Sequence, residues 1–438
     1  MSDNQYMPDE KSFTRLLTIP RINPICVDFN LPPSKSHMIR LLALSSISAG
    51  ETKLIAQGKL GRDIESMISA MASLGVGIER YEKQGSYITS VTGVGEQGFT
   101  NLVSTVYCGN SGTALRIVMG LIASIDRPIT VSGDDSLSAR DNDFMINSLS
   151  QADVTVEKIQ TGNLPISICG PWFRGDTESK TATIDCSKSS QALTSWMIAS
   201  ALFPCDVILN LNGKTVSNKH YLLTKKMCND SGAKIEINEE NILLNRWNIK
   251  LLPEYIIPGD SSIVSFAILL VKLHNCEARV FNWPDNQDAL GNELLKKEAS
   301  SLGVEWVDNR ITNQNKSSYQ VYDLTDCNDL ITPLSAILAI SGGGKISGIT
   351  HTIYKESNRI EKTIQLLADF GLKIDYENDS LDIEGGQNPR QPISAVNCHN
   401  DHRLFMTAAL LMSKFGGELI GQGLHEVADV DFMTRLGL

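Results

Sequence analysis

A polar cluster that runs into an apolar helix recurs six times along the chain, and this repeat restricts the possible folds more than any other feature. In the first cluster, residues 31–40, Pro32 and Pro33 cannot lie inside a helix, whereas Ser34 or Ser36 can cap one. Apolar residues then follow at helical spacing. The other five clusters are the segments 108–116, 188–193, 259–263, 327–330 and 400–404. Successive starts lie roughly 70 to 80 residues apart, a fixed period typical of repeated architectures.

A second feature recurs with the same period. About 40 residues after each start, another predicted helix ends, and a glycine just beyond it can adopt the left-handed cap without strain. Every unit except the second has this glycine, at Gly75, Gly232, Gly303, Gly371 and Gly437. Short strand signals follow, such as residues 86–91 and 242–244. Each unit is therefore predicted to hold two helices and several strands, which indicates an α/β protein.

The length of 438 residues is too great for one hydrophobic core. Three copies of the unit would make one globular domain. We therefore predict two pseudo-symmetric lobes, one formed by residues 1–33 and 257–438 and the other by residues 34–256.

The predicted helix starts favour a negatively charged ligand. Free backbone N–H groups and the positive end of the helix dipole attract anions, and Lys35 and Arg40 add two full charges at the first start. The alternative is an ordinary capped surface helix with two solvated cations. If each lobe turns its helix starts toward a shared cleft, the ligand should be polyanionic.

Composition excludes several classes of function. The net charge of −11 and the absence of a Lys/Arg run argue against nucleic-acid binding. The nine scattered cysteines form no Cys-x-x-Cys pair, which indicates reduced thiols in the cytoplasm. The first residues are polar and acidic, and no apolar run reaches about 18 residues, so we expect no membrane segment. His399 and His402 have a metal-compatible spacing but lack a third ligand, and we expect no metal.

Residues suited to chemistry are distributed unevenly between the two halves. The first half supplies residues that can hold phosphate oxygens or hydroxyls: Lys35, Ser36, Arg40, Asn110, Gly112, Thr113, Ser189, Ser190, Gln191 and Ser217. The second half supplies acids and bases: Asp329, Lys355, Glu356, Arg359, Asp401, His402 and Arg403. The spacing of Lys355 and Arg359 predicts one helix face for both. The alternatives are a solvated helix terminus with an intrahelical ion pair for that segment, and helix capping for Asp329 and Asp401.

These motifs, in this order, resemble the 5-enolpyruvylshikimate-3-phosphate synthases. The resemblance rests on Leu31-Pro-Pro-Ser-Lys-Ser-x-x-x-Arg40, Gly109-Asn-Ser-Gly-Thr-Ala-x-Arg116, Ser189-Ser-Gln191, Asp329, Lys355-Glu-x-x-Arg359 and Asp401-His-Arg403. It covers about residues 25–433. The related UDP-N-acetylglucosamine enolpyruvyl transferases lack the Ser-Ser-Gln signature. The resemblance implies two lobes of three βαβαββ-type units, an inside-out α/β barrel in which the chain crosses between the lobes twice.

The resemblance also implies a reaction without metal or cofactor. The enolpyruvyl group of phosphoenolpyruvate would pass to the 5-hydroxyl of shikimate 3-phosphate, with release of phosphate, as a step of aromatic amino acid biosynthesis. Asp329 would take the hydroxyl proton, and Lys35 and Glu356 would move protons at the methylene group. Residues holding shikimate 3-phosphate would be Lys35, Ser36, Arg40, Ser189, Ser190, Gln191, Ser217, Asp329 and Lys355. Those holding phosphoenolpyruvate would be Lys35, Gly112, Gln191, Arg359 and Arg403.

Two positions depart from the family pattern. Ser136 stands where we expect an arginine that binds the phosphoenolpyruvate phosphate, and Val427 stands where we expect a lysine. Arg140 or His425 could compensate. The departures leave open a divergent relative that binds a phosphorylated cyclitol acid without using phosphoenolpyruvate, and a non-enzymatic ligand sensor. Retention of the proton-transfer residues favours an enzyme, which we expect to act as a monomer.

Overall fold

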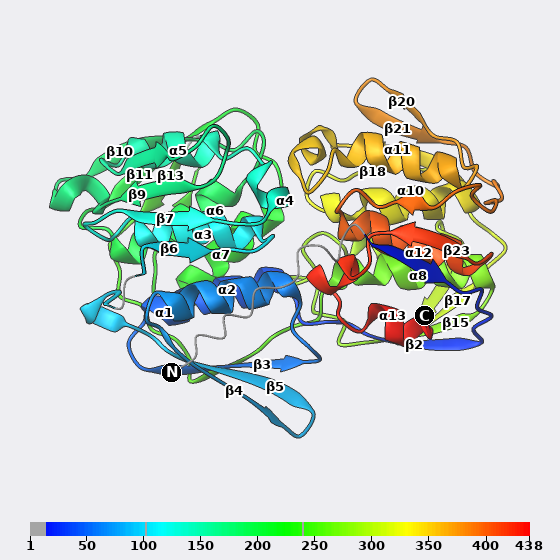
Figure 1. The fold of residues 1–438 in the computed structure, drawn as a ribbon, viewed down its shortest axis with the longest axis horizontal. Coiled ribbons are helices and arrows are strands. Elements are labelled where there is room, and N and C mark those ends of the chain that lie inside the picture. The colour runs from blue at the N-terminus through cyan, green and yellow to red at the C-terminus, as the bar shows by residue number, and fades with distance from the viewer. Residues whose placement is uncertain (1–14, 101–102, 239–240) are drawn as a thin grey trace.

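The structure, a computed structural model, describes residues 15–100, 103–238 and 241–438. Two lobes lie side by side, each built of helices and small sheets (Figure 1). The polar segment 1–14 lies outside the described residues.

The first lobe contains three four-stranded sheets. Their strands, in spatial order, are β14 (Glu254–Ile256), β3 (Glu51–Gln57), β5 (Ser86–Thr92) and β4 (Gly77–Lys83); β6 (Thr105–Tyr107), β7 (Ile129–Ser132), β9 (Ile166–Cys169) and β8 (Thr155–Lys158); and β10 (Lys180–Asp185), β11 (Val207–Asn212), β13 (Asn241–Leu244) and β12 (Glu236–Ile237).

The second lobe contains the other three sheets of the described chain. Their strands are β16 (Val304–Val307), β17 (Arg310–Asn313), β15 (Glu277–Phe281) and β2 (Cys26–Asn30); β18 (Gln320–Asp323), β19 (Gly344–Ser347), β21 (Ser380–Ile383) and β20 (Asp375–Glu377); and β1 (Leu16–Ile19), β23 (Gly417–Ile420) and β22 (Val396–Asn397).

Five of these sheets share one pairing pattern. A parallel pair, such as β6 with β7, continues into two antiparallel pairs, β7 with β9 and β9 with β8. The sixth sheet keeps the parallel pair β22 and β23 but takes β1, from the start of the chain, as its antiparallel neighbour. The predicted α/β class and the six repeated units are therefore confirmed.

Each unit also contributes two helices. The first helices are α1 (Lys35–Ile47), α3 (Gly112–Ile122), α6 (Gln191–Ala199), α8 (Val264–His274), α10 (Ile331–Ile340) and α12 (His402–Ser413). The second helices are α2 (Arg62–Ser73), α5 (Asp143–Ser150), α7 (Asn218–Asp230), α9 (Leu294–Lys297), α11 (Arg359–Asp369) and α13 (Phe432–Leu436). A short extra helix, α4 (Asp135–Ser138), precedes α5. All six first helices begin within a few residues of the predicted starts.

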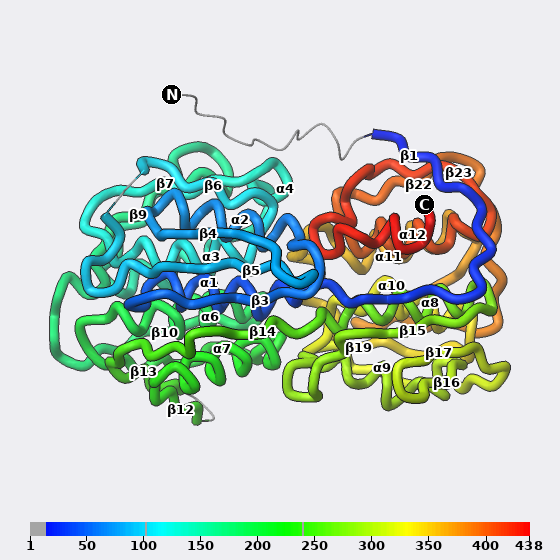
Figure 2. Tube along the Cα trace, turned by 90° about the horizontal axis from the view of Figure 1, so that it is seen from below, coloured from blue at the N-terminus to red at the C-terminus, as the bar shows by residue number. Residues whose placement is uncertain are grey.

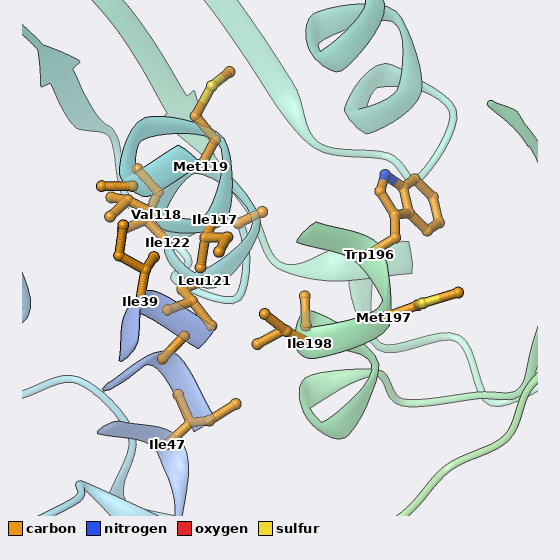
Figure 3. Packing of buried hydrophobic residues seen from close by; sticks show 14 of the residues in the cluster. Ile39, Ile47, Ile117, Val118, Met119, Leu121, Ile122, Trp196, Met197 and Ile198 are labelled. Carbon is orange, nitrogen blue, oxygen red and sulfur yellow. The ribbon is translucent and has the colours of Figure 1, made fainter. Parts of the chain in front are cut away.

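The first helices form the interior of each lobe. α3, for example, is buried at every residue except Thr113, because it packs against α6 and α1 (Figure 3). A helix enclosed on all sides must be mostly apolar all round, which explains why α1, α6, α8 and α10 show little separation of polar and apolar faces. Two separate hydrophobic clusters result, one drawn from residues 38–257 and the other from residues 19–31 and 263–436.

The turns after the second helices follow the predicted rule. The five glycines named above all have positive φ, between 70° at Gly437 and 108° at Gly232. In the second unit Asp153 takes the same conformation, with φ of 59°. Aspartate tolerates the left-handed region better than most residues do, so this unit keeps the turn without a glycine.

The chain passes between the lobes at two places, and the two crossing segments run beside each other (Figure 2). Pro33 and Gly259 form an antiparallel bridge. The N–H of Ser34 donates to the carbonyl of Pro258 at 2.8 Å, and the N–H of Asp260 donates to the carbonyl of Pro32 at 2.8 Å. The crossings lie next to the predicted lobe boundaries, residues 33/34 and 256/257, although the exact boundaries stay a prediction.

Candidate active site

A cavity lies between the lobes, and three helix starts of the first lobe line it. These are the N-termini of α1, α3 and α6, represented by Lys35, Gly112 and Gln191. Six cationic side chains line the cavity: Lys35, Arg40, Arg116, Arg140, Lys188 and Lys355. The carboxylates that line it are Asp63, Asp141, Asp329 and Glu356. The cavity of this acidic protein is therefore suited to a polyanion.

One set of lining residues consists of hydroxyls grouped around Ser217. Ser190 donates from Oγ to the carbonyl of Ser217 at 3.2 Å, and Asn328 donates from Nδ2 to Oγ of Ser217 at 2.9 Å. Ser217 has a φ of 56°, an unusual conformation for a serine, and its N–H is held by the carbonyl of Thr325 across the cleft. Ser189 accepts from the N–H of Gln191 at 3.2 Å. We call these three serines, together with Lys355, which also lines the cavity, the hydroxyl set.

The hydroxyl set contains one cation, Lys355, and two imidazole side chains line the same cavity. Burial lowers the pKa of Lys355, although Asp329 opposes the shift. Burial also lowers the pKa of His220 and of His351 to about 3, with nearby cations adding to the effect. Both histidines are therefore neutral at physiological pH, and each has a buried ring nitrogen, His220 Nδ1 and His351 Nε2, without a partner among the described residues.

Arg40 lies buried at the edge of the cavity, where it holds α7 against α1. Its Nε donates to Oγ1 of Thr224 at 2.8 Å, and its Nη1 donates to the carbonyl of Ser36 at 2.7 Å. A third bond runs from Nη2 to the carbonyl of His220 at 3.1 Å. Burial lowers the pKa of Arg40 to about 10, so the guanidinium keeps its charge at neutral pH.

A second set of residues surrounds the start of α3. A Cβ atom on Gly112 would lie 2.3 Å from Nη1 of Arg116 and 3.0 Å from Nη1 of Arg140, so a larger residue here would displace the ends of these two side chains. Burial, together with the charge of Arg140, lowers the pKa of Arg116 to about 9. Arg140 donates from Nη2 to Oδ1 of Asn110 at 2.5 Å. We call Gly112, Arg116 and Arg140 the guanidinium set.

Gln191 lies between the two sets. Its N–H contacts Ser189 of the hydroxyl set, and its Nε2 donates to Oγ1 of Thr113 at 3.0 Å, beside Gly112. The structure thus brings the signatures of the second and third units together, as the convergence of helix starts predicts.

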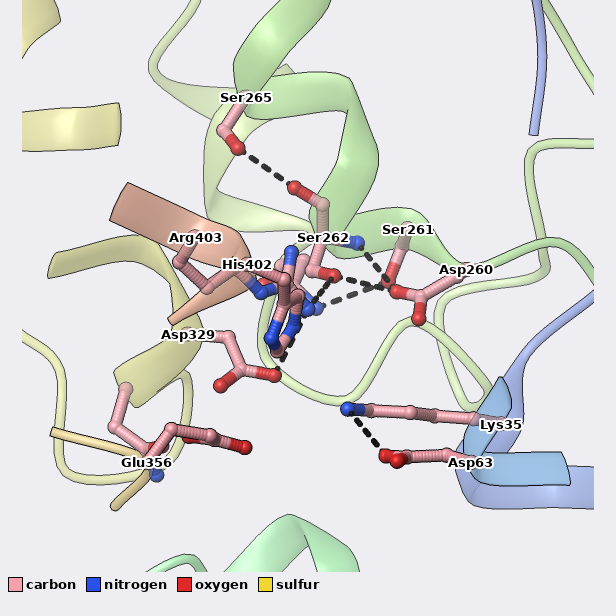
Figure 4. A network of polar contacts seen from close by, with 12 residues as sticks. Lys35, Asp63, Asp260, Ser261, Ser262, Ser265, Asp329, Glu356, His402 and Arg403 are labelled. Carbon is pink, nitrogen blue, oxygen red and sulfur yellow. Dashed lines mark hydrogen bonds and ion pairs between the residues drawn. The ribbon is translucent and has the colours of Figure 1, made fainter. Parts of the chain in front are cut away.

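Charged groups of the second lobe form the opposite wall. Asp329 accepts from Nη1 of Arg359 at 2.7 Å and from Nη2 of Arg403 at 3.0 Å. Arg359 also donates to Glu356 at 2.6 Å and to the fully buried Asp401 at 2.8 Å. Figure 4 shows Asp329 joined to Arg403, with the side chain of Lys35 extending toward them from the opposite side. Burial raises the pKa of Asp329 and of Glu356, but the neighbouring cations outweigh it and hold both pKa values well below the usual range.

Lys35 belongs to the first lobe but faces this wall. Its Nζ pairs with Oδ2 of Asp63 at 3.1 Å. Burial by itself lowers the pKa of Lys35, whereas the carboxylates of Asp63, Asp329 and Glu356 outweigh it and raise the pKa above the ordinary value. Lys35 is therefore an ammonium ion at neutral pH.

Arg359 and Arg403, which the resemblance assigns to phosphoenolpyruvate, differ in how many of their N–H donors lack a partner. Arg359 spends donors on Asp329, Glu356 and Asp401. In Arg403, Nε and Nη1 are buried and have no partner among the described residues, while Nη2 donates to Ser262 and Asp329. A buried, partly unsatisfied guanidinium is costly unless a ligand completes it. Both arginines lie behind Asp329 and Glu356 and do not themselves line the cavity.

The prediction that Lys355 and Arg359 lie on one face of a helix is wrong. α11 begins at Arg359, capped by Asn358, whose side chain accepts from the N–H of Glu361. Lys355 precedes the cap in an extended conformation. The asparagine cap therefore starts the helix four residues later than the charge spacing suggests. Asp401 does cap α12, as the alternative held, and binds Arg359 as well.

The structure also bears on Ser136, which stands where we expected an arginine. Its Oγ is buried without a partner among the described residues, and Ser136 does not line the cavity, whereas Arg140 does. The loop therefore still supplies a cation, four residues further on. Val427 is buried and its carbonyl faces Gly61 of the other lobe. His425 stacks on Phe405 and does not line the cavity, so it does not compensate.

Several lining residues were given no role by the sequence reasoning. Arg116 was quoted within its motif, and its place four residues after Gly112 on one helix face was a usable signal. Asp63, Asp141, Lys188, His220 and His351 also line the cavity. They come from the second helices and from loops, whose side chains converge only in three dimensions.

Other kinds of site find no support in the part of the chain that the structure describes. Within residues 15–100, 103–238 and 241–438, no three His, Cys, Asp or Glu side chains gather to hold a metal ion. Over the same residues, no helix has the length and apolarity needed to cross a membrane. All nine cysteines are free.

Comparison with known proteins gives a consistent result. The sequence model of the family described as EPSP synthase (3-phosphoshikimate 1-carboxyvinyltransferase) matches residues 20–423. A protein of Methanobrevibacter smithii named 3-phosphoshikimate 1-carboxyvinyltransferase is 28% identical over 443 residues, covering 96% of this chain and 97% of its own. The protein of that name from Caldivirga maquilingensis is 26% identical over 410 residues, covering 92% of each chain.

Two solved structures share the fold. The EPSP synthase of Acinetobacter baumannii has a TM-score of 0.70 and 21% identity, covering 96% of this chain and 97% of its own. The enolpyruvyl transferase NikO of Streptomyces tendae has a TM-score of 0.73 and 13% identity, covering 96% of each chain. At these identities the likeness concerns the fold alone.

Proposed function

The chain belongs to the EPSP synthase family, and from this premise we propose that it transfers the enolpyruvyl group of phosphoenolpyruvate to the 5-hydroxyl of shikimate 3-phosphate, releasing phosphate. One observation carries the proposal. A single cavity holds two distinct anion-binding sets, the hydroxyl set and the guanidinium set, and an acid–base group of Lys35, Asp329 and Glu356. Joining two anionic substrates by proton transfer requires this combination.

Shikimate 3-phosphate is assigned to the hydroxyl set. Ser189, Ser190 and Ser217 offer hydroxyl donors, and Lys355 offers a charge, to a phosphate group. Ser36 and Arg40 are assigned to the ring carboxylate, with Gln191 between the two substrates. Arg40 already donates to Thr224, to Thr194 and to two carbonyls, which leaves one of its five N–H groups, on Nη1, for the carboxylate, and Ser36 would supply a second donor.

Phosphoenolpyruvate is assigned to the guanidinium set and to the arginines behind Asp329. Gly112, Lys35, Arg116 and Arg140 would surround its phosphate, which is the leaving group and gains charge as it departs. Its carboxylate would bind the guanidinium of Arg403, whose Nε and Nη1 have no partner among the described residues. Arg359 would join only by loosening its bonds to Glu356 and Asp329.

The substrate carboxylate would compete with Asp329 and Glu356 for the same arginines, so substrate binding would determine when the two acids become stronger bases. Asp329 and Glu356 are ionised and paired with arginine, so they are weak bases. A substrate carboxylate on Arg359 and Arg403 draws both guanidinium groups away, which raises the proton affinity of the two acids. Asp329 could then accept the proton of the attacking hydroxyl. Lys35 and Glu356 would deliver a proton to the methylene carbon and later remove one as phosphate leaves.

The position of Arg140 also bears on the alternative of a relative that does not use phosphoenolpyruvate. That alternative rested on two missing cations, at positions 136 and 427. Arg140 supplies a cation in place of the one missing at position 136, so only Val427 still favours that alternative. A monomeric state and a cytoplasmic location stay predictions.

Calorimetric titration tests the substrate assignment. Wild type should bind shikimate 3-phosphate, and the double variant Ser189→Ala/Ser190→Ala should bind it at least tenfold more weakly, since each hydrogen bond to a charged group contributes about 1.5–3 kcal/mol. Ser187→Ala, an exposed neighbour outside the cavity, is the matched control and should bind normally. Undetectable binding by wild type at millimolar ligand would refute the proposal.

A further inference from the structure

Lys188 joins the two lobes at the rim of the cavity. It lies in the loop between β10 and α6, immediately before Ser189, and its side chain is less than half exposed. The Nζ atom pairs with Oδ2 of Asp141, in the first lobe, at 2.9 Å. The same atom lies 5.0 Å from the ring centre of Tyr354, in the second lobe, within the range of a cation–π contact.

The two partners of Lys188 have different relations to the cavity. Asp141 follows Arg140 of the guanidinium set, and its carbonyl accepts from Nη2 of Arg116 at 3.0 Å. Tyr354 precedes Lys355 of the hydroxyl set. Lys188 and Tyr354 therefore face each other one residue outward from Ser189 and Lys355, and all four line the cavity. The bond to Asp141 raises the pKa of Lys188, so the amine stays charged at neutral pH.

The contacts of Lys188 are of a kind that a ligand can replace. Exposed ion pairs and cation–π contacts are individually weak and are screened by salt. A phosphate dianion beside Ser189 offers a stronger partner, because it carries up to two charges and several acceptor oxygens. The flexible lysine stem needs only a rotamer change to exchange Asp141 for such a group.

We propose that Lys188 is a specificity-determining residue for the phosphate group of shikimate 3-phosphate: it forms the outer wall of the hydroxyl set, turns its ammonium from Asp141 to the bound phosphate, and keeps the Tyr354 side of the cleft closed over it. This inference rests on the proposed function. It assigns Lys188 to recognition of the phosphorylated ring and gives it no part in proton transfer.

Binding measurements on Lys188→Met, Lys188→Arg and Tyr354→Leu test the inference. Lys188→Met should raise the Kd for shikimate 3-phosphate about tenfold, the loss of one charged contact, while leaving the affinity for unphosphorylated shikimate unchanged. The tenfold effect should shrink as salt is raised from 50 mM to 500 mM, since the ammonium is solvent-accessible. Lys188→Arg should restore most of the affinity.

Two further readouts separate recognition from structure. In turnover, the loss in Lys188→Met should fall on the KM for shikimate 3-phosphate rather than on kcat. Tyr354→Leu should lose less affinity for shikimate 3-phosphate than Lys188→Met does. The double variant should lose less affinity than the two single losses combined, because either single change already removes the contact between Lys188 and Tyr354. The thermal midpoints of all variants should match wild type.

The outcomes distinguish this inference from the proposed function. Wild type that fails to bind shikimate 3-phosphate overturns both. Wild type that binds, with Lys188→Met binding equally well, overturns the role of Lys188 alone. A Lys188→Met variant that loses affinity for shikimate as strongly as for its phosphate also overturns it, because the residue would then not read the phosphate group.

Discussion

The Nη1 atom of Arg359 donates a hydrogen bond to Oδ1 of Asp329 at 2.7 Å, and the other oxygen of that carboxylate is held by Arg403 at 3.0 Å. The proposed base is thus shared between the two arginines assigned to the carboxylate of phosphoenolpyruvate. Under the proposed assignment, substrate binding and activation of the base would be one event, because the same donors would serve both carboxylates.

Replacement of Asp329 tests its role as the base. Asp329→Asn keeps the shape and one acceptor oxygen but removes the proton acceptor, so kcat should fall by about 10²–10⁴. Binding of shikimate 3-phosphate should change far less than kcat. Asp375→Asn, an exposed position on β20, is the control and should retain full activity. Activity within threefold of wild type in Asp329→Asn would remove this residue from the mechanism.

A comparison of Arg140 with Ser136 tests the corrected cation assignment. Arg140→Ala should lower kcat/KM for phosphoenolpyruvate by about a hundredfold, because a charged donor near the leaving phosphate is lost. Ser136→Ala should have little effect, since Ser136 does not line the cavity. Steady-state kinetics on both variants decide the matter. Equal losses in the two variants, or none in Arg140→Ala, would contradict the assignment.

The comparison of position 136 with position 140 also shows where sequence reasoning stops. Helix starts, glycine turns and the six-unit repeat could be predicted because each depends on a few neighbouring residues. The sequence offered Arg140 and His425 as compensating cations but could not choose between them, because the short helix α4 and its capping residue Asp134 determine which side chain after Gly133 turns inward. Asp63 and Lys188 were missed for a similar reason, since their partners lie 28 and 47 residues away in the chain.

The start of α11 at Arg359 is a further feature that the sequence reasoning did not predict. Charge spacing alone placed Lys355 and Arg359 on one helix face, but the Asn358 cap ends the extended segment and begins the helix at Arg359. Lys355 is thereby free to face the hydroxyl set while Arg359 turns into the second lobe. A local rule about helix faces gave the wrong geometry here, whereas the capping preference of asparagine would have given the right one.

Substitution of Gly112 tests the packing of the guanidinium set. In Gly112→Ala, the new methyl group would lie 2.3 Å from Nη1 of Arg116 and 3.0 Å from Nη1 of Arg140, so both guanidinium groups must shift. We expect the KM for phosphoenolpyruvate to rise at least tenfold. The Kd for shikimate 3-phosphate, bound by the hydroxyl set, should stay within twofold and serves as the internal control. A larger change in the Kd for shikimate 3-phosphate than in the KM for phosphoenolpyruvate would contradict the separation of the hydroxyl set from the guanidinium set.

The buried, neutral His351 predicts a specific pH dependence of stability. Burial and the charge of Lys355 lower its pKa to about 3, whereas in the unfolded chain it titrates near the ordinary value of about 6.5. Between these values the unfolded state binds the extra proton, so this residue costs stability as the pH falls below about 6.5. At pH 5 the cost is about 2 kcal/mol.

Denaturant unfolding at pH 7.5 and pH 5.0 measures this cost. Wild type should lose more stability between the two pH values than His351→Asn does, by about 2 kcal/mol, because asparagine does not titrate. The carboxylates with lowered pKa values contribute only at more acidic pH and do not interfere. An equal loss in the two proteins would show that His351 is not held neutral in the fold.

Release of phosphate from phosphoenolpyruvate is the most direct test of the proposed reaction. In a continuous phosphate assay without added metal or nucleotide, wild type should release phosphate only when both phosphoenolpyruvate and shikimate 3-phosphate are present, in equal amount to the enolpyruvyl product. Absence of release under conditions where calorimetry shows bound shikimate 3-phosphate, or release at the same rate without it, would contradict the account.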